Sequence, residues 1–179
     1  MNNNIDPTTR IIFLDIDGVM NHAIYFKRRK EGKFERDPID PECVQYLNRI
    51  IAATGAKVVI SSTWRMHYDI EYMQTILDQK GFEGEVIGET PDVYSSHKYN
   101  APRGCEIKDW IKKHVERDNY DLTYRRFIIL DDDSDMLLSQ AEHFIRTDFM
   151  GAGLTENLAY RAKRTLLGLE NIYTEDHTL

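Results

Sequence analysis

Cysteine is scarce in this chain, which has only Cys43 and Cys105 among its 179 residues. The two residues form neither a CxxC pair nor a spacing typical of zinc ligands, so we expect no structural zinc site and no disulfide framework. Both are interpreted as reduced thiols in a reducing compartment, which favours a cytoplasmic protein.

Long apolar runs and an excess of basic residues are also missing. No apolar stretch approaches the roughly 20 residues that span a bilayer, and residues 1–7 lack the basic and apolar regions of a signal peptide. The 30 acidic residues outnumber the 23 Lys and Arg, giving a net charge of −7. This balance disfavours a broad surface that coats nucleic acid, although a local basic patch stays open. We expect no membrane association and see no sign of an obligate protein partner.

The remaining composition is that of an ordinary globular protein, with 41% hydrophobic and 30% charged residues. A length of 179 residues suits one domain, which we expect to span residues 1–179 with its core at about residues 10–168. No segment between the expected elements is long enough for a substantial second domain.

Short apolar runs alternate along the chain with patterns of helical period. We expect strands at 11–14, 57–60, 85–87, 126–130 and 143–147, and helices at 41–54, 69–80, 103–116, 136–141 and from 155 onward. Asp40 followed by Pro41 is typical of a helix start, and Gly55 of a helix end. The alternation predicts an α/β fold, a single Rossmann-like, doubly wound parallel sheet without a large cap domain.

The first expected strand ends abruptly in two acids, Asp15 and Asp17, followed by Gly18. Unpaired carboxylates are too costly inside a buried strand, so the strand must end there and present both acids at its carboxyl end. Ligands bind at that edge in open α/β sheets. Two neighbouring carboxylates also suit a hard cation such as Mg²⁺. A calcium-binding EF-hand loop would require Glu at position twelve, where this chain has Phe26.

Two further strands end in polar clusters of the same kind. The run 126–130 is followed by acids at 131, 132, 133 and 135, and the strand 57–60 is followed by Ser61, Ser62, Thr63, Trp64 and Arg65. The acidic run taken alone would be read as a solvated turn. Three such junctions together indicate one site.

These motifs resemble the haloacid dehalogenase (HAD) superfamily of phosphohydrolases. The resemblance rests on Asp-x-Asp-Gly-Val at 15–19, the hydroxyl at 61 and the acidic cluster at 131–135. The sequence around Ser61, Arg103 and Asp131 is similar to that of small, capless HAD domains grouped with nucleic-acid-repair phosphatases.

The resemblance implies a role for each matching residue. Asp15 matches the nucleophile that forms an aspartyl-phosphate, and Asp17 matches the general acid and base. Ser61 matches the hydroxyl that holds the phosphoryl group. Asp131 and Asp132 match the acids that complete an Mg²⁺ site with Asp15 and with the backbone carbonyl of Asp17. Asp135 fits the trailing acid.

The chain departs from the family at the cation that usually begins the helix before the acidic strand. That place holds Arg103, which is always charged and grips phosphate bidentately. Lys98 in the preceding loop is the rival, and Lys108 lies one turn deeper in the helix. We prefer Arg103.

Three residues around these motifs, Ser62, Arg65 and His22, each allow two interpretations. Ser62 is either a loop hydroxyl that satisfies the backbone or a further phosphate contact. Arg65 either contacts substrate or pairs with an acid. His22 follows the first motif and is a possible substrate contact, although a surface histidine is the safer interpretation. Trp64 is expected to pack rather than take part in chemistry.

A basic, aromatic segment follows the first motif, within a small flap expected at about 20–37. Residues 25–36 carry six Lys or Arg and three aromatic residues, and Gly32 suits a hairpin turn. The segment would either be a solvated hairpin or steer a polyanion and stack a base.

Together these features predict an Mg²⁺-dependent phosphatase that hydrolyses phosphomonoesters, with a phosphorylated small molecule or a nucleic-acid end as substrate. The alternatives are a non-catalytic phosphate-binding or interaction module, and a phosphotransferase that uses the same site. The sequence leaves hydrolysis and transfer undistinguished.

Overall fold

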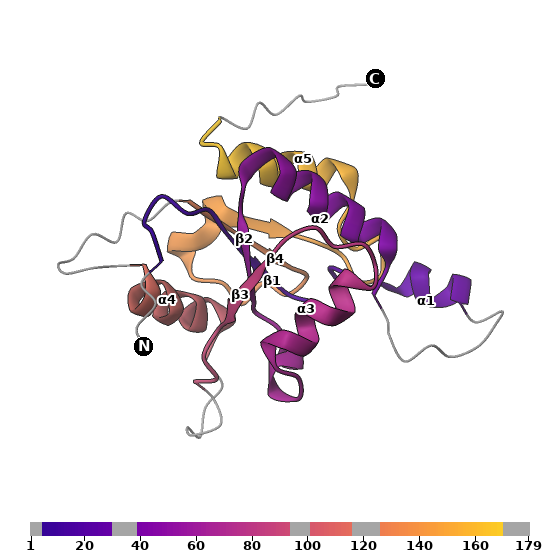
Figure 1. The fold of residues 1–179 in the computed structure, drawn as a ribbon, viewed down its shortest axis with the longest axis horizontal. Helices are drawn as coiled ribbons and strands as arrows, with labels where there is room; N and C mark the ends of the chain where they lie inside the picture. The colour runs from indigo at the N-terminus through magenta and orange to yellow at the C-terminus, as the bar shows by residue number, and fades with distance from the viewer. Residues whose placement is uncertain (1–4, 30–38, 94–100, 116–125, 170–179) are drawn as a thin grey trace.

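A computed structural model describes residues 5–29, 39–93, 101–115 and 126–169 (Figure 1). The strands are β1 (Ile11–Leu14), β2 (Lys57–Ile60), β3 (Val86–Glu89), β4 (Phe127–Asp131) and β5 (Phe144–Arg146). The helices are α1 (Ala23–Arg29), α2 (Pro41–Thr54), α3 (Ile70–Asp78), α4 (Arg103–His114) and α5 (Glu156–Leu166). Two 3₁₀ helices complete the set, η1 (Thr63–Met66) and η2 (Leu138–His143).

All five strands form one parallel sheet in the order β3-β2-β1-β4-β5. The chain winds outward from the central β1 in both directions, which is the doubly wound arrangement that the alternating pattern predicts. The predicted α/β, Rossmann-like class without a large cap is therefore confirmed for the described residues, and each predicted strand lies within two residues of an observed one.

Side chains of β1 alternate between two cores, which makes the fold three-layered. Ile12 and Leu14 lie in the larger core together with apolar side chains of α2, α3 and α5. Ile11 and Phe13 point to the opposite face, where Trp110 and its neighbours on α4 cover the sheet. Figure 1 shows α4 on one side of the sheet and the adjoining α2 and α5 on the other.

The start and end of α2 follow the predicted signals. The Asp40 carboxylate accepts from the Glu42 amide at 2.9 Å, and Pro41 occupies the first helical position. Gly55 ends the helix with a φ of 66°, in the left-handed region that suits glycine.

None of the described helices is long and apolar enough to cross a bilayer.

Two predicted elements differ from the structure. The segment after the first motif was expected to form a hairpin, but residues 23–29 are the helix α1. Phe26 helps to hold it, since its ring packs near that of Phe149, with 6.3 Å between ring centroids. The rest of the expected flap, including the hairpin turn at Gly32, lies outside the described residues. The short helix predicted at 136–141 is the 3₁₀ helix η2, shifted two residues along the chain.

Candidate active site

The strand register brings three polar residues abreast at one edge of the sheet. Leu14 pairs with Ile60 of β2 and with Leu130 of β4, so the residues that follow, Asp15, Ser61 and Asp131, lie side by side at the carboxyl ends of the three strands. The Asp15 amide donates to the Leu130 carbonyl oxygen (3.0 Å), and the Ser61 amide donates to the Leu14 carbonyl oxygen (2.8 Å). Asp15, Ser61 and Asp131 are 7%, 0% and 1% exposed. The carboxyl ends of three neighbouring strands thus form one buried polar cluster.

Three acids at this edge are close enough to share a cation. Carboxylate oxygens of Asp15, Asp131 and Asp132 lie within 4.8 Å of one another. Burial raises the pKa of Asp15 to about 6, against the opposing charge of Arg103. Burial and the charge of Asp15 raise the pKa of Asp131 to about 8, and burial also raises the pKa of Asp132. A divalent cation bound between the carboxylates would stabilise their charged forms.

Gly18 allows Asp132 to reach the cluster. The glycine has a φ of 77°, in the left-handed region. A Cβ atom at this position would lie 2.3 Å from the Cγ atom of Asp132. The first motif therefore needs glycine both for its turn and for the space that the Asp132 carboxylate fills.

Two buried polar atoms of the cluster are left without a hydrogen-bond partner among the described residues. They are the Ser61 hydroxyl oxygen and the Asp131 Oδ2. Buried polar atoms normally have partners, because an unmade hydrogen bond costs about 1–3 kcal/mol. A bound cation and a phosphate would satisfy both atoms, so the residues present fit Mg²⁺ and a phosphoryl group.

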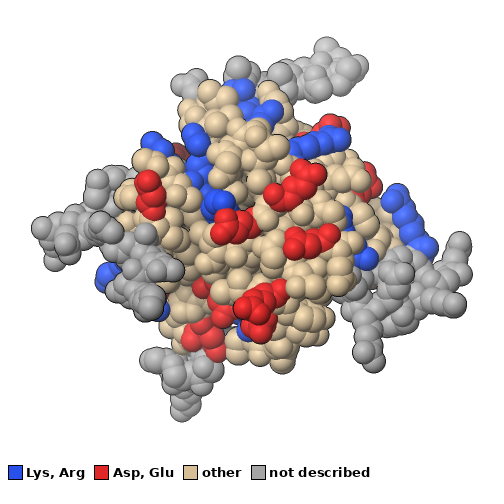
Figure 2. Space-filling model, in the orientation of Figure 1, with Lys and Arg blue, Asp and Glu red and all other residues tan. Residues whose placement is uncertain are grey.

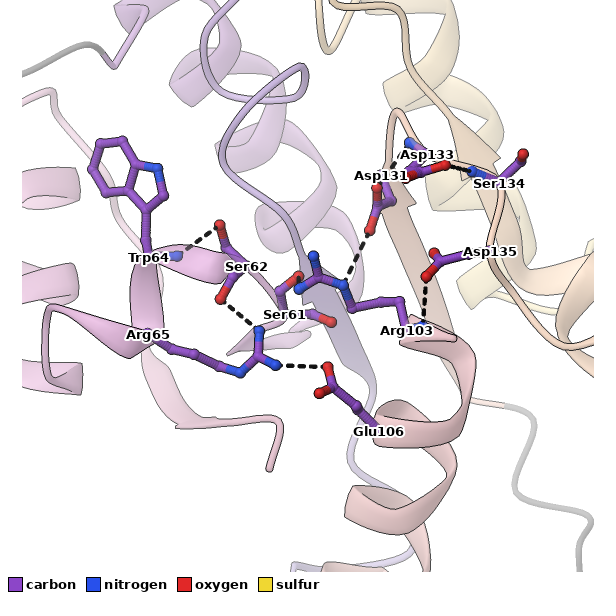
Figure 3. Close-up of polar contacts among 10 residues, drawn as sticks. All are labelled: Ser61, Ser62, Trp64, Arg65, Arg103, Glu106, Asp131, Asp133, Ser134 and Asp135. Carbon is purple, nitrogen blue, oxygen red and sulfur yellow. Dashed lines mark hydrogen bonds and ion pairs between the residues drawn. The ribbon is translucent and has the colours of Figure 1, made fainter. Parts of the chain in front are cut away.

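Arg103, the first residue of α4, extends between two of these strand ends (Figure 3). Its Nη1 donates to the Ser61 carbonyl oxygen, and its Nε lies 4.0 Å from Asp131 Oδ2. The guanidinium thus lies beside the Ser61 backbone and the Asp131 carboxylate. Its rival Lys98 lies outside the described residues, and Lys108 is exposed further along α4.

Asp135 holds the start of α4. The Arg103 amide donates to Asp135 Oδ2 (2.7 Å), and the Gly104 amide donates to the Asp135 carbonyl oxygen (3.3 Å). Pro102, at the N-cap position, makes no side-chain cap. The trailing acid of the cluster therefore caps the helix that carries Arg103, and its backbone and side chain fix that cation against the sheet edge.

The Asp17 carboxylate lies apart from the three-acid cluster and accepts two hydrogen bonds. Its Oδ1 accepts from Asn21 Nδ2 at 2.7 Å, and its Oδ2 accepts from Trp64 Nε1 at 2.9 Å. The residue is exposed, whereas Asp15 is buried. A metal contact by Asp17 would thus use its backbone carbonyl, as the family resemblance implies, and would leave the carboxylate off the metal.

The hydroxyl-rich turn after β2 is held by its own backbone and by a buried ion pair. The Ser62 hydroxyl accepts from the Trp64 amide (3.3 Å) and also hydrogen-bonds Asp15. Arg65 Nη2 donates to Glu106 Oε2 at 2.6 Å, and the two side chains are 6% and 1% exposed (Figure 3). Of the two readings of Arg65, pairing with an acid is the one that the structure shows.

His22 is buried rather than on the surface, so the surface interpretation is wrong. Its Nε2 lies 2.9 Å from Asp40 Oδ2, and its Nδ1 accepts from the Tyr25 amide (3.3 Å). Cys43 lies close enough to complete a possible ligand set. However, the Cys43 thiol donates to the carbonyl oxygens of Ala152 and Leu154, and burial raises its pKa to about 12. The contact of His22 with Asp40 joins the start of α1 to the start of α2. His22 thus belongs to a group separate from the three-acid cluster.

A family model described as the HAD domain in Swiss Army Knife RNA repair proteins matches residues 11–159. The chain belongs to this family. The match spans the whole site, from β1 to α5, and places the chain in a superfamily of hydrolases and phosphatases. No curated protein and no solved structure matches this HAD domain.

The sequence did not reveal the contacts of two residues that shape the site of this HAD domain. Trp64 was expected only to pack, yet it also bonds Asp17 across 47 positions of the chain. Asp135 was matched to the family's trailing acid, yet it caps α4 across 32 positions. The nearness of Trp64 to Ser61 in the sequence was the available signal, because a side chain that follows a strand end lies at the ligand edge.

Proposed function

We propose that this HAD domain is an Mg²⁺-dependent phosphatase that hydrolyses phosphomonoesters through an aspartyl-phosphate on Asp15. The observation that supports this most is the register that sets Asp15, Ser61 and Asp131 abreast, with Arg103 between two of them. An acid, a hydroxyl and a cation at one buried edge are the groups that phosphoryl transfer needs.

Asp15, Asp131, Asp132 and the backbone carbonyl of Asp17 would hold the magnesium ion. An ion bound there supplies positive charge that screens the Asp15 carboxylate from the phosphate and neutralises charge in the transition state. Burial raises the pKa of Asp15 and of Asp131, and at Asp131 the charge of Asp15 adds to the effect. Positive charge beside these acids would oppose the shift.

In the first half-reaction, a carboxylate oxygen of Asp15 attacks phosphorus. The phosphorus–oxygen bond to the leaving group breaks, and Asp17 gives its proton to the departing oxygen. The Ser61 hydroxyl and the Arg103 guanidinium hold the phosphoryl oxygens during this step. Asn21 and Trp64 orient the Asp17 carboxylate through their two hydrogen bonds.

In the second half-reaction, Asp17 is a carboxylate and takes a proton from water. That water attacks phosphorus, the bond from phosphorus to the Asp15 oxygen breaks, and inorganic phosphate leaves. Asp15 returns as a carboxylate and Asp17 is protonated again, so the cycle closes with water consumed. An acceptor other than water would give phosphotransfer from the same intermediate.

The substrate class that we propose is the phosphorylated end of a nucleotide or a polynucleotide. The family description, which names RNA repair proteins, supports it. The absence of a large cap among the described residues also supports it, because an uncapped edge can admit a bulky leaving group. A phosphorylated small molecule remains the other candidate for the same chemistry.

The test is release of inorganic phosphate from a panel of compounds, in Mg²⁺ and in EDTA. The panel holds sugar phosphates, mononucleotides, and oligonucleotides phosphorylated at either end. We expect Mg²⁺-dependent release that Asp15→Asn abolishes and that is greatest for a nucleic-acid end. Binding of these compounds without release or transfer would instead favour a non-catalytic module.

A further inference from the structure

Three aromatic side chains form a row that begins at the proposed general acid. Trp64, Tyr68 and Tyr72 recur every fourth residue through η1 and into α3. The ring centroids of Trp64 and Tyr68 are 5.7 Å apart, and those of Tyr68 and Tyr72 are 4.4 Å apart with the planes 14° from parallel. The row is therefore a continuous set of contacting rings.

The outer two rings of the row are open to solvent. Tyr68 is 39% exposed and Tyr72 is 44% exposed. Trp64 is half-buried, because it also packs against the larger core. Aromatic rings in contact on a surface mark a binding surface for a flat, apolar group.

The chemistry of the proposed reaction sets which part of a substrate meets this row. Asp17 protonates the oxygen of the leaving group, so that group departs beside the Asp17 carboxylate. Trp64 Nε1 donates to the same carboxylate at 2.9 Å. A leaving group that departs beside Asp17 therefore lies next to the indole of Trp64, and the ring contacts of Trp64 with Tyr68 and of Tyr68 with Tyr72 extend the row from that point.

The charge around the row favours an aromatic ring over a chain of phosphates as the occupant. Between residues 63 and 78 the basic residues are Arg65, which is paired with Glu106, and His67. Asp69 and Glu71 lie between the two tyrosines. Figure 2 shows acidic side chains across the part of the visible face where Figure 1 draws α3.

We infer that the row formed by Trp64, Tyr68 and Tyr72 stacks nucleobases of the leaving group, so that the enzyme selects nucleoside phosphates through ring faces. This inference rests on the proposed function and specifies what the site recognises beyond the phosphate. Stacking on aromatic side chains tolerates any base sequence, since every base has a π-face.

The test measures binding separately from turnover. The Asp15→Asn protein, which holds substrate without consuming it, is titrated with a short phosphorylated oligonucleotide and with an abasic oligonucleotide of equal length and charge. Trp64 is the reporter, because the other tryptophan, Trp110, is only 2% exposed. We expect quenched tryptophan fluorescence and at least about five-fold tighter binding when bases are present.

Matched variants locate the effect. In the Asp15→Asn background, Tyr68→Leu with Tyr72→Leu should reduce the preference for the base-containing ligand about five-fold or more, while Tyr68→Phe with Tyr72→Phe should retain it. Tyr160→Leu is the control, since Tyr160 is 53% exposed on α5 and has its own cation contacts.

Equal binding of the two oligonucleotides, or a preference that survives both leucine substitutions, would overturn the stacking inference. Either result would leave the phosphatase proposal standing if phosphate release persists in the unmodified protein. Failure of release from every compound, with base-dependent binding intact, would instead overturn the proposed function alone.

Discussion

At the scale of single residues, the burial of two acids of the site makes stability depend on pH. Asp15 and Asp131 have folded-state pKa values of about 6 and about 8, above the ordinary value of 3.8. Between pH 4 and 8 the folded protein therefore binds more protons than the unfolded chain, so these two groups make stability fall as pH rises. The slope cannot exceed about 1.4 kcal/mol per pH unit for each group.

Asp131→Asn tests this pH-dependent loss of stability. In EDTA, we expect the melting temperature of the variant to exceed that of the unmodified protein at pH 8 and the difference to shrink toward pH 5. Mg²⁺ should stabilise the unmodified protein more at pH 8 than at pH 5 and should stabilise the variant little at either. Thermal unfolding in the four conditions provides the check, and a variant less stable in EDTA at pH 8 would contradict it.

Trp64 is a positioning residue for Asp17, and Trp64→Phe tests this role. The substitution removes the indole N–H and keeps a ring for packing. Losing one hydrogen bond to a charged group costs about 1.5 kcal/mol, so we expect kcat to fall about tenfold with little change in KM and an altered pH profile. A variant with unchanged kcat and pH profile would show that the hydrogen bond has no role in proton transfer.

The sequence indicated where the acids of the candidate site lie, but it did not indicate which residues pair with one another. Asp15, Asp131 and Ser61 follow apolar strands directly, so strand ends alone place them. Burial of His22 against Asp40 and of Arg65 against Glu106 joins residues 18 and 41 positions apart. No local pattern encodes such pairs, because they form only once α2 and α4 have packed on the sheet.

At the scale of elements, the turn after β1 and the turn after β4 interlock through Gly18. Gly18→Ala adds a Cβ atom 2.3 Å from Asp132 Cγ at a φ of 77°. We expect it to displace Asp132, to weaken Mg²⁺-dependent stabilisation and activity, and to lower stability by more than the roughly 1–2 kcal/mol of left-handed backbone strain.

Gly55→Ala is the matched control for that substitution. Gly55 has a φ of 66° and no atom within 4 Å of an added Cβ. It should carry the backbone strain alone and leave magnesium binding intact. Denaturant unfolding and Mg²⁺ titration of both variants make the comparison, and equal effects on Mg²⁺ binding would contradict the interlock.

Element boundaries were predictable where signals are local. Asp40, Pro41 and Gly55 bracket α2 as expected, because capping and left-handed glycine depend on neighbours within one turn. The segment 23–29 was misjudged, since its charged and aromatic residues carry no clear period and its helix is held partly by Phe149 from a distant loop.

At the scale of the whole molecule, the net charge of −7 opposes a polyanionic substrate. Ring stacking, rather than a basic surface, would then supply affinity for an oligonucleotide. We expect kcat/KM for a phosphorylated oligonucleotide to hold or rise as salt increases from about 50 to about 200 mM, because screening weakens overall repulsion. Steady-state kinetics across that range test this. A steep fall of kcat/KM with salt, which Lys and Arg contacts to phosphates would produce, would contradict the expectation.

The overall architecture followed from alternating strands and helices, because that order permits few topologies. The spacing of Trp64, Tyr68 and Tyr72, every fourth residue, is a local signal for the aromatic row. Its place beside Asp17 was not predictable, because the hydrogen bond from Trp64 joins residues 47 positions apart.

The most direct measurement is a rapid acid quench of the enzyme with Mg²⁺ and its best substrate, followed by mass spectrometry of the peptide that contains Asp15. The account predicts one phosphoryl group on Asp15 before steady-state phosphate release, and none in Asp15→Asn. Asp133→Asn should behave normally, since the Asp133 carboxylate accepts a hydrogen bond from the Ser134 amide of its own turn. Full phosphate release by Asp15→Asn, or turnover without a phosphoryl group on Asp15, would contradict it.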